Sequence, residues 1–127
     1  YSKGKYDKAI EYFKKALVSE LKTLGPDHPS VATTWNNLGL VWDSKGEYDK
    51  AIEYYDKALA SGLKTYGPDH PHVAATWNNL GLVWDSKGEY DKAIEYFDKA
   101  LALLEKVLGQ DHPSTKVVKN NLNSVRK

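Results

Sequence analysis

The chain has 127 residues, of which 41% are hydrophobic, and 18 basic against 17 acidic residues give it a formal net charge of +1. This near balance excludes a bulk electrostatic attraction to nucleic acid or to an acidic membrane surface. The absence of cysteine excludes disulfides, thiolate metal sites and cysteine nucleophiles.

Six helices are predicted along the chain. The first covers residues 5–24. The second begins at Pro29, a residue suited to the first turn of a helix, with Asp27 or His28 at its cap, and ends at Gly46. Apolar residues recur in both at spacings of three and four. The linkers are short, so consecutive helices must be antiparallel neighbours. The remaining helices are predicted at residues 47–66, 71–87, 89–108 and 113–127.

Two long stretches of the chain are identical. Trp35–Tyr54 recurs residue for residue at Trp77–Tyr96, an offset of 42 residues. The same offset carries Gly-Pro-Asp-His-Pro at 25–29 onto 67–71, and onto Gly-Gln-Asp-His-Pro at 109–113. Such a period is typical of a repeat array, in which each unit packs on its neighbours. We therefore predict an all-α solenoid of antiparallel helix pairs.

The offset divides the chain into four parts. Residues 1–26 hold the second helix of an incomplete repeat, residues 27–68 and 69–110 are two repeats, and residues 111–127 are a capping helix. Tyr1-Ser2-Lys3-Gly4 falls on Asp43–Gly46, the tail of a first helix. We therefore interpret the chain as a piece of a longer array, natural or built to a consensus.

The last helix departs from the repeat. Lys119, Asn123 and Arg126 stand where the preceding repeat has tryptophan, glycine and tryptophan, whereas Leu122 keeps an apolar side. A terminal helix with one polar face is what a solenoid needs at its exposed end. We predict that this helix is the C-terminal cap.

The repeat carries a recognisable motif. Trp35, Leu38 and Gly39 follow the spacing W-x2-L-G, and Ala93 with Phe97 follows A-x3-F. This pattern resembles the tetratricopeptide repeat, and its 42-residue period is similar to the long repeats of kinesin light chains and nephrocystin-type proteins. The resemblance implies a right-handed superhelix whose inner surface is lined by the first helix of each pair. It also implies binding of peptides or protein segments, with no catalysis and no cofactor.

An asparagine pair recurs once in each period, at 36–37, 78–79 and 120–121, and follows a tryptophan in the first two cases. In the family that this chain resembles, an asparagine at the second place of the pair bonds the backbone of an extended peptide. The alternative is that these amides hold the next repeat through hydrogen bonds between helices. The predicted peptide-binding groove consists of Thr33, Asn36, Asn37, Leu40, Asp43, Ala75, Asn78, Asn79, Leu82, Asp85 and Asn121.

Metal binding and catalysis find little support in the sequence. His28, His70 and His112 recur with the connector, one in each layer of helices. Because stacked helices lie ~10 Å apart, these rings are too distant to share one ion, and we interpret them as structural. The chain contains no Gly-rich phosphate loop, no nucleophile elbow and no HExxH. We therefore predict no enzyme and no metal site.

Two functions compete on this interpretation. The first is a module that binds a peptide or protein segment in the groove. The alternative is a structural scaffold that self-associates through its N-terminal helix, where Ile10, Phe13 and Leu17 would be partly bare. No apolar run approaches the ~20 residues of a membrane span and no signal peptide is apparent, so we expect a cytoplasmic protein.

Overall fold

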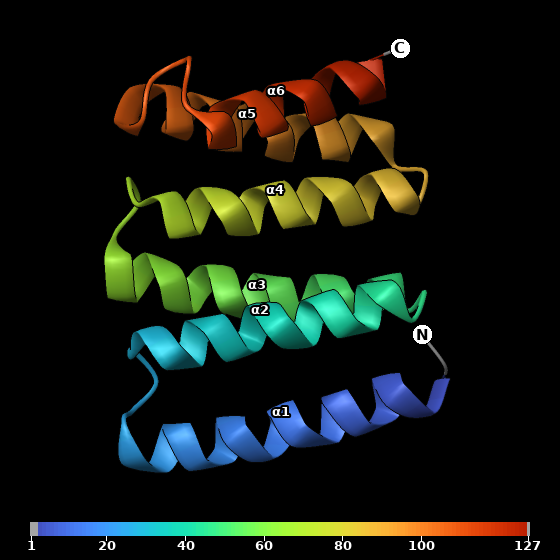
Figure 1. Cartoon of the computed structure of the whole chain (residues 1–127), viewed down its shortest axis with the longest axis vertical. Coiled ribbons are helices and arrows are strands. Elements are labelled where there is room, and N and C mark those ends of the chain that lie inside the picture. Colours follow the sequence, from blue (N-terminus) through green and yellow to red (C-terminus); the bar gives the residue numbers. More distant parts are fainter. Residues whose placement is uncertain (1–2, 127) are drawn as a thin grey trace. The chain divides into compact units, whose positions relative to one another are not determined.

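The computed structural model describes residues 3–126, which form six α-helices and no strand (Figure 1). This confirms the predicted all-α repeat fold, with helix ends within about two residues of those expected. The expectations for Tyr1, Ser2 and Lys127 lie outside the described residues. The helices are α1 (Lys3–Thr23), α2 (Pro29–Ser44), α3 (Tyr48–Tyr66), α4 (Pro71–Ser86), α5 (Tyr90–Val107) and α6 (Pro113–Arg126).

The chain forms two compact units. Unit 1 (Tyr1–Thr65) contains α1, α2 and all but the last residue of α3, and unit 2 (Tyr66–Lys127) contains α4, α5 and α6. In unit 1, α1 packs against α2, and in unit 2, α5 packs against both α4 and α6. In unit 2, the first helix of a pair, α4, therefore meets the second helix of that pair, α5, inside one unit.

A histidine caps the helix that follows each connector. The Nδ1 atom of His28, which has extended backbone angles, accepts a hydrogen bond of 3.1 Å from the backbone N–H of Ser30. His70 and His112 accept the corresponding bonds at 3.0 and 3.1 Å. Each ring satisfies one of the backbone donors left without a partner at a helix start. The recurrence of histidine is thus explained by capping.

Glycine ends the first helix of each pair. Gly46 has a φ of +86°, its N–H donates to the carbonyl of Asp43, and the N–H of Glu47 donates to that of Trp42, both at 2.9 Å. These two bonds form a Schellman motif, which requires a left-handed residue at this place. Gly88 repeats the geometry after α4.

One buried cluster of unit 1 lies between α1 and α2. Its buried members are Ile10, Leu17, Val31 and Leu38, and Phe13 packs against them half-buried. The expectation that α1 leaves its apolar stripe bare is therefore corrected for Ile10 and Leu17, which are only 7% and 8% exposed. The cause is α2, which covers this side of α1.

A glycine of each first helix lies against an aromatic ring of its partner. A Cβ atom on Gly39 would lie 2.5 Å from Cδ1 of Tyr55, and one on Gly81 would lie 2.6 Å from Cδ1 of Phe97. Real Cβ atoms do not come so close, so only glycine lets these helices approach. A glycine in the middle of each first helix therefore allows the two helices of a pair to lie close together.

Candidate functional site

Two of the predicted groove residues of α2 line a hollow in unit 1. Asn37 is half-buried and Leu40 is 53% exposed, and both line a groove of about 270 Å³ between α1 and α2. Of the other predicted residues on α2, Thr33 is exposed, and Asn36 and Asp43 are half-buried. The remaining lining residues are Lys5, Tyr6, Ala9, Phe13, Val41 and Ser44.

The predicted residues of α4 are divided between two hollows of unit 2. Ala75 and Asn78 line one of about 210 Å³, together with residues of α5 and α6, whereas Asp85 lines another beside Tyr90. Asn79 is half-buried and Leu82 is 38% exposed, and neither belongs to the lining of these two hollows. In unit 2, the predicted groove is therefore a surface strip with hollows at its edges.

Two predicted groove residues are already bonded to each other inside unit 2. The side-chain N–H of Asn121 donates a hydrogen bond of 3.0 Å to the side-chain oxygen of Asn78. Asn121 is the second asparagine of its pair and Asn78 is the first of the pair in the preceding repeat. Here the asparagines join two helices, which is the alternative role that the sequence left open.

Asp43, the acidic residue of the predicted groove in unit 1, is not a fully hydrated carboxylate. Burial raises the pKa of Asp43 above its usual range. Burial, followed by the negative charge of Asp43, also raises the pKa of Tyr55. Because low-dielectric surroundings disfavour the ionised form of Asp43, this residue attracts a basic partner less strongly than its sequence suggests.

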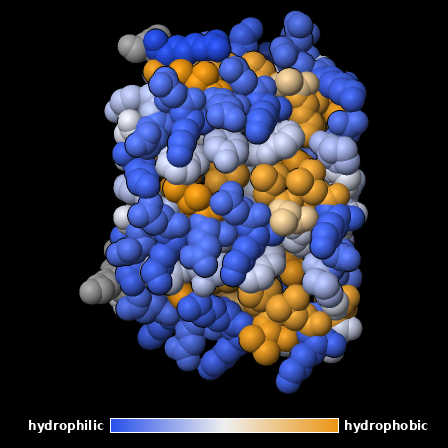
Figure 2. Space-filling model, turned by 180° about the vertical axis from the view of Figure 1, so that it is seen from behind, coloured by the Kyte–Doolittle hydropathy of each residue, from blue (hydrophilic) through white to orange (hydrophobic). Residues whose placement is uncertain are grey.

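The outer face of α1 is more exposed than its core-facing side. Tyr12 is 68% exposed and Val18 is 56% exposed. Figure 2 shows apolar surface patches bordered by hydrophilic side chains, including one at the lower end where α1 lies. The sequence pattern predicts only the stripe of Ile10, Phe13 and Leu17 as accessible. It therefore does not predict the exposure of Tyr12 and Val18.

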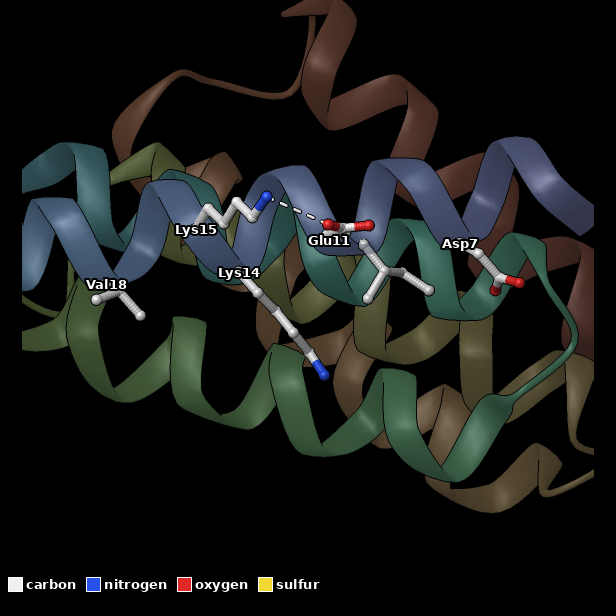
Figure 3. Close-up of a pocket in the computed structure, with 6 residues that line it drawn as sticks. Asp7, Glu11, Lys14, Lys15 and Val18 are labelled. Carbon is white, nitrogen blue, oxygen red and sulfur yellow. Dashed lines mark ion pairs between the residues drawn. The ribbon is translucent and has the colours of Figure 1, made fainter.

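A shallow hollow of about 490 Å³ runs along the same helix and is lined largely by charged side chains (Figure 3). Lys15 and Glu11 form an ion pair of 3.2 Å there, and both side chains are well exposed. Such exposed ion pairs contribute only ~0–1 kcal/mol to stability. They give no rigid arrangement of charges that would hold a ligand. We therefore do not place the functional site in this hollow.

Two histidines of unit 2 contact the same aromatic ring. Tyr66 stacks on His70 with ring centroids 4.3 Å apart, and His72 lies 4.7 Å from the same ring. Burial, with a smaller contribution from His70, lowers the pKa of His72. Within residues 3–126, no group of three or more histidine, aspartate or glutamate residues could hold a metal ion. None of the described helices is long and apolar enough to cross a membrane.

The chain matches a known repeat family in sequence. Family models described as tetratricopeptide repeat match residues 1–45, 43–84 and 73–114, so together they cover most of the chain. No curated protein matches the chain.

Solved structures share the fold. BtubC (BKLC) from P. vanneervenii superposes with a TM-score of 0.87 and 30% identity, over 96% of this chain and 49% of that one. Nearly identical TPR-like repeats of a candidate kinesin light chain from Podospora anserina give a TM-score of 0.83 and 24% identity, over 96% and 58%. SycD, a type III secretion translocator chaperone of Yersinia enterocolitica, gives 0.71 and 19%, over 97% and 73%. The chain spans about half the length of the first two structures.

Proposed function

Since the chain belongs to the tetratricopeptide repeat family, whose members mediate protein–protein interaction, we propose that it binds an extended segment of a partner protein through the first helix of a repeat, α2 in unit 1 or α4 in unit 2. We propose no catalytic activity. The translocator chaperone among the similar structures is in keeping with a protein partner but supports only the fold, because its identity to this chain is low.

The proposal rests on one repeated arrangement. Asn37 and Asn79 occupy the same position of the two first helices and are half-buried, and Leu40 and Leu82 beside them are 53% and 38% exposed. An amide offers both donors and an acceptor, so it can pair with a peptide group whatever the side chain of that residue. An exposed leucine adds apolar contact. The arrangement favours recognition of backbone with a mild preference for apolar side chains.

The charge of the strip adds little selectivity. Its acidic members are Asp43 and Asp85, both half-buried, and burial raises the pKa of Asp43. We therefore expect neutral to mildly basic segments to bind best. We also expect modest affinity, because few side chains contact the ligand and an extended segment loses conformational entropy on binding.

Self-association, the alternative that the sequence raised, has less support. Two of the three residues that it needed, Ile10 and Leu17, are buried between α1 and α2. Phe13 is half-buried in the same cluster. Of these three residues, only Phe13 is therefore partly accessible to a second copy of the chain.

A peptide display library of random 12-residue segments tests the proposed function. Peptides that bind the chain would be measured by fluorescence anisotropy against wild type, Asn79→Ala and Leu82→Ala. We expect each variant to weaken binding about tenfold, the loss of one hydrogen bond or one apolar contact of about 1.4 kcal/mol. The matched control is Glu95→Ala on the exposed side of α5, which should not change the affinity. Equal affinity in all four proteins would reject the proposal.

A further inference from the structure

Two hollows of unit 2 lie along the same boundary between α4 and α6. Asn78 lines the first hollow, of about 210 Å³, and Asp85, seven residues later on α4, lines the second, of about 470 Å³. Val118 and Val125 of α6 line the same two hollows and are also seven residues apart. Because seven residues are close to two full helical turns, the two hollows share one side of each helix.

The first hollow is apolar. Its most buried members, Ala74, Leu104 and Val118, are 0%, 4% and 3% exposed, and Val117 at its rim is 53% exposed. An engineered protein cavity of about 150 Å³ holds a benzene molecule. A hollow of about 210 Å³ therefore has room for a branched aliphatic side chain such as that of leucine.

The second hollow contains an acidic group without a partner. Asp85 is half-buried, and within residues 3–126 its carboxylate makes no hydrogen bond and no ion pair. The other lining residues, Tyr90, Ser124 and Val125, carry no positive charge. Because charges attract each other more strongly at a partly buried place than in open water, this carboxylate favours a cationic group of a ligand.

Two cationic side chains close to this hollow in the sequence are engaged elsewhere. The ammonium group of Lys87 lies 5.1 Å from the ring centre of Trp84. Arg126 forms an ion pair of 3.5 Å with Asp98 of α5. Neither of these cations pairs with Asp85, so its negative charge is available to a bound segment.

The separation of the two hollows selects a spacing in the ligand. Ala75 and Asp85 are ten residues apart on α4, and Val117 and Val125 are eight apart on α6, so the hollows are roughly 12–15 Å apart at 1.5 Å per residue. An extended segment rises about 3.3 Å per residue, so four residues span about 13 Å. Side chains at positions i and i+4 of such a segment also point to the same side, whereas those at i+3 and i+5 point to the other side.

We propose that unit 2 recognises a segment of a partner protein in which an aliphatic residue (leucine, isoleucine or valine) and a lysine or arginine stand four positions apart, in either order. The aliphatic side chain enters the hollow at Ala75, and the cationic group pairs with Asp85. The proposal rests on the proposed function, because it needs an extended ligand on α4. Asn79 lies between the two hollows along the helix, where it pairs with the backbone of the intervening residues.

A spacing scan of synthetic peptides tests this proposal. Each 12-residue peptide has a background of serine and threonine, with one leucine and one lysine separated by two to six positions in either order. Fluorescence anisotropy measures its binding to the chain. We expect the tightest binding at a separation of four, about tenfold tighter than at three or five, which corresponds to about 1.4 kcal/mol. Equal affinity at all separations, or an optimum at any other separation, would overturn the proposal.

Two variants of the chain assign each side chain of the peptide to its hollow. Asp85→Asn should weaken the peptide with lysine about tenfold and leave a peptide with glutamine at that place unchanged. Ala75→Leu fills the apolar hollow, so it should weaken the peptide with leucine about tenfold and leave a peptide with alanine at that place unchanged. If Ala75→Leu does not fold, Val117→Asp at the exposed rim takes its place. Equal losses for both peptides of a pair would overturn the proposal.

Matched controls lie on the exposed side of α5. Glu95→Gln removes a carboxylate charge and Ala102→Leu adds the same side chain as Ala75→Leu, and both variants should bind like wild type. Salt provides a second readout of the cationic contact, because it screens the attraction between charges. Raising the ionic strength should weaken the peptide with lysine more than the peptide with glutamine, and equal weakening would overturn the pairing with Asp85.

Failure of this proposal and failure of the proposed function give different results. If peptides from the random library bind and Asn79→Ala weakens them, but leucine and lysine bind equally well at every separation, only the spacing proposal fails. If no peptide depends on Asn79, the proposed function fails for α4 and the spacing proposal fails with it.

Discussion

The side-chain amide of Asn121 donates a 3.0 Å hydrogen bond to the side chain of Asn78, which lies 43 residues earlier in the chain. The bond connects α6 to α4, two helices that also touch each other directly. A repeated asparagine can thus serve the packing of helices in one place and remain available for a ligand in another. Asn79, the neighbour of Asn78, is the residue that we assign to the ligand.

A double-mutant cycle measures the bond between these helices. We expect Asn78→Ala and Asn121→Ala each to lower the free energy of unfolding, with a coupling of about 0.5–1.5 kcal/mol between them. Urea denaturation of the two single variants and the double variant provides the value. Additive effects would show that the bond does not contribute to stability.

Gly81→Ala should destabilise unit 2. Alanine is the better helix former by about 1 kcal/mol, but its Cβ would lie 2.6 Å from the ring of Phe97. Overpacking of a rigid core costs roughly 1–3 kcal/mol, so we expect a net loss of stability in thermal denaturation.

Gly4→Ala is the matched control for this change. Gly4 also lies in a helix, but a Cβ there would meet nothing within 4 Å. It should therefore unfold at the same temperature as wild type or slightly higher. If Gly81→Ala behaved in the same way, the close approach of α4 to α5 would not be needed.

His112→Ala should remove a helix cap. The Nδ1 atom of His112 accepts from the backbone N–H of Ser114 at 3.1 Å, and loss of an N-cap acceptor costs about 0.5–2 kcal/mol. His112→Asn keeps an acceptor at the same place and should retain most of the stability. Chemical denaturation of the two variants makes the comparison, and equal losses would argue against capping.

Stability should fall at acid pH, in part through His72. Burial, then the neighbouring His70, lowers its pKa in the folded chain from the ordinary 6.5. The unfolded chain therefore binds a proton more readily, so this contribution is complete above pH 6.5 and is lost as the pH falls through the lowered pKa.

His72→Ser, which copies Ser30 at the corresponding position of the preceding repeat, tests this contribution. We expect the variant to lose less unfolding free energy than wild type between pH 7.5 and pH 5. Urea denaturation at both pH values measures the two slopes. Identical slopes in both proteins would show that His72 does not titrate with folding.

The helices could be predicted from the sequence because each one is specified locally. Pro29 and Gly46 mark the ends of a helix by backbone chemistry alone, and the 42-residue period repeats the same signals along the chain. The cap was left open between Asp27 and His28, and only the ring geometry of His28 decides it.

The site was less predictable because it depends on which helices touch. The hydrogen bond from Asn121 to Asn78 forms only if α6 and α4 pack side by side with these two residues opposite each other. The spacing of residues within one helix does not reveal this register. The exposure of Tyr12 and the burial of Ile10 likewise depend on where a neighbouring helix lies. Period and composition predict which side chains share a face, but not which of those faces stay uncovered.

The most direct test of peptide recognition follows the side-chain amides of Asn37 and Asn79 by nuclear magnetic resonance. A ¹⁵N-labelled chain would be titrated with a peptide selected from the 12-residue library. We predict saturable shifts of both side-chain NH₂ signals, together with the backbone signals of Leu40 and Leu82. Saturable shifts confined to the outer faces of α3 and α5, with both asparagine signals unmoved, would contradict the account.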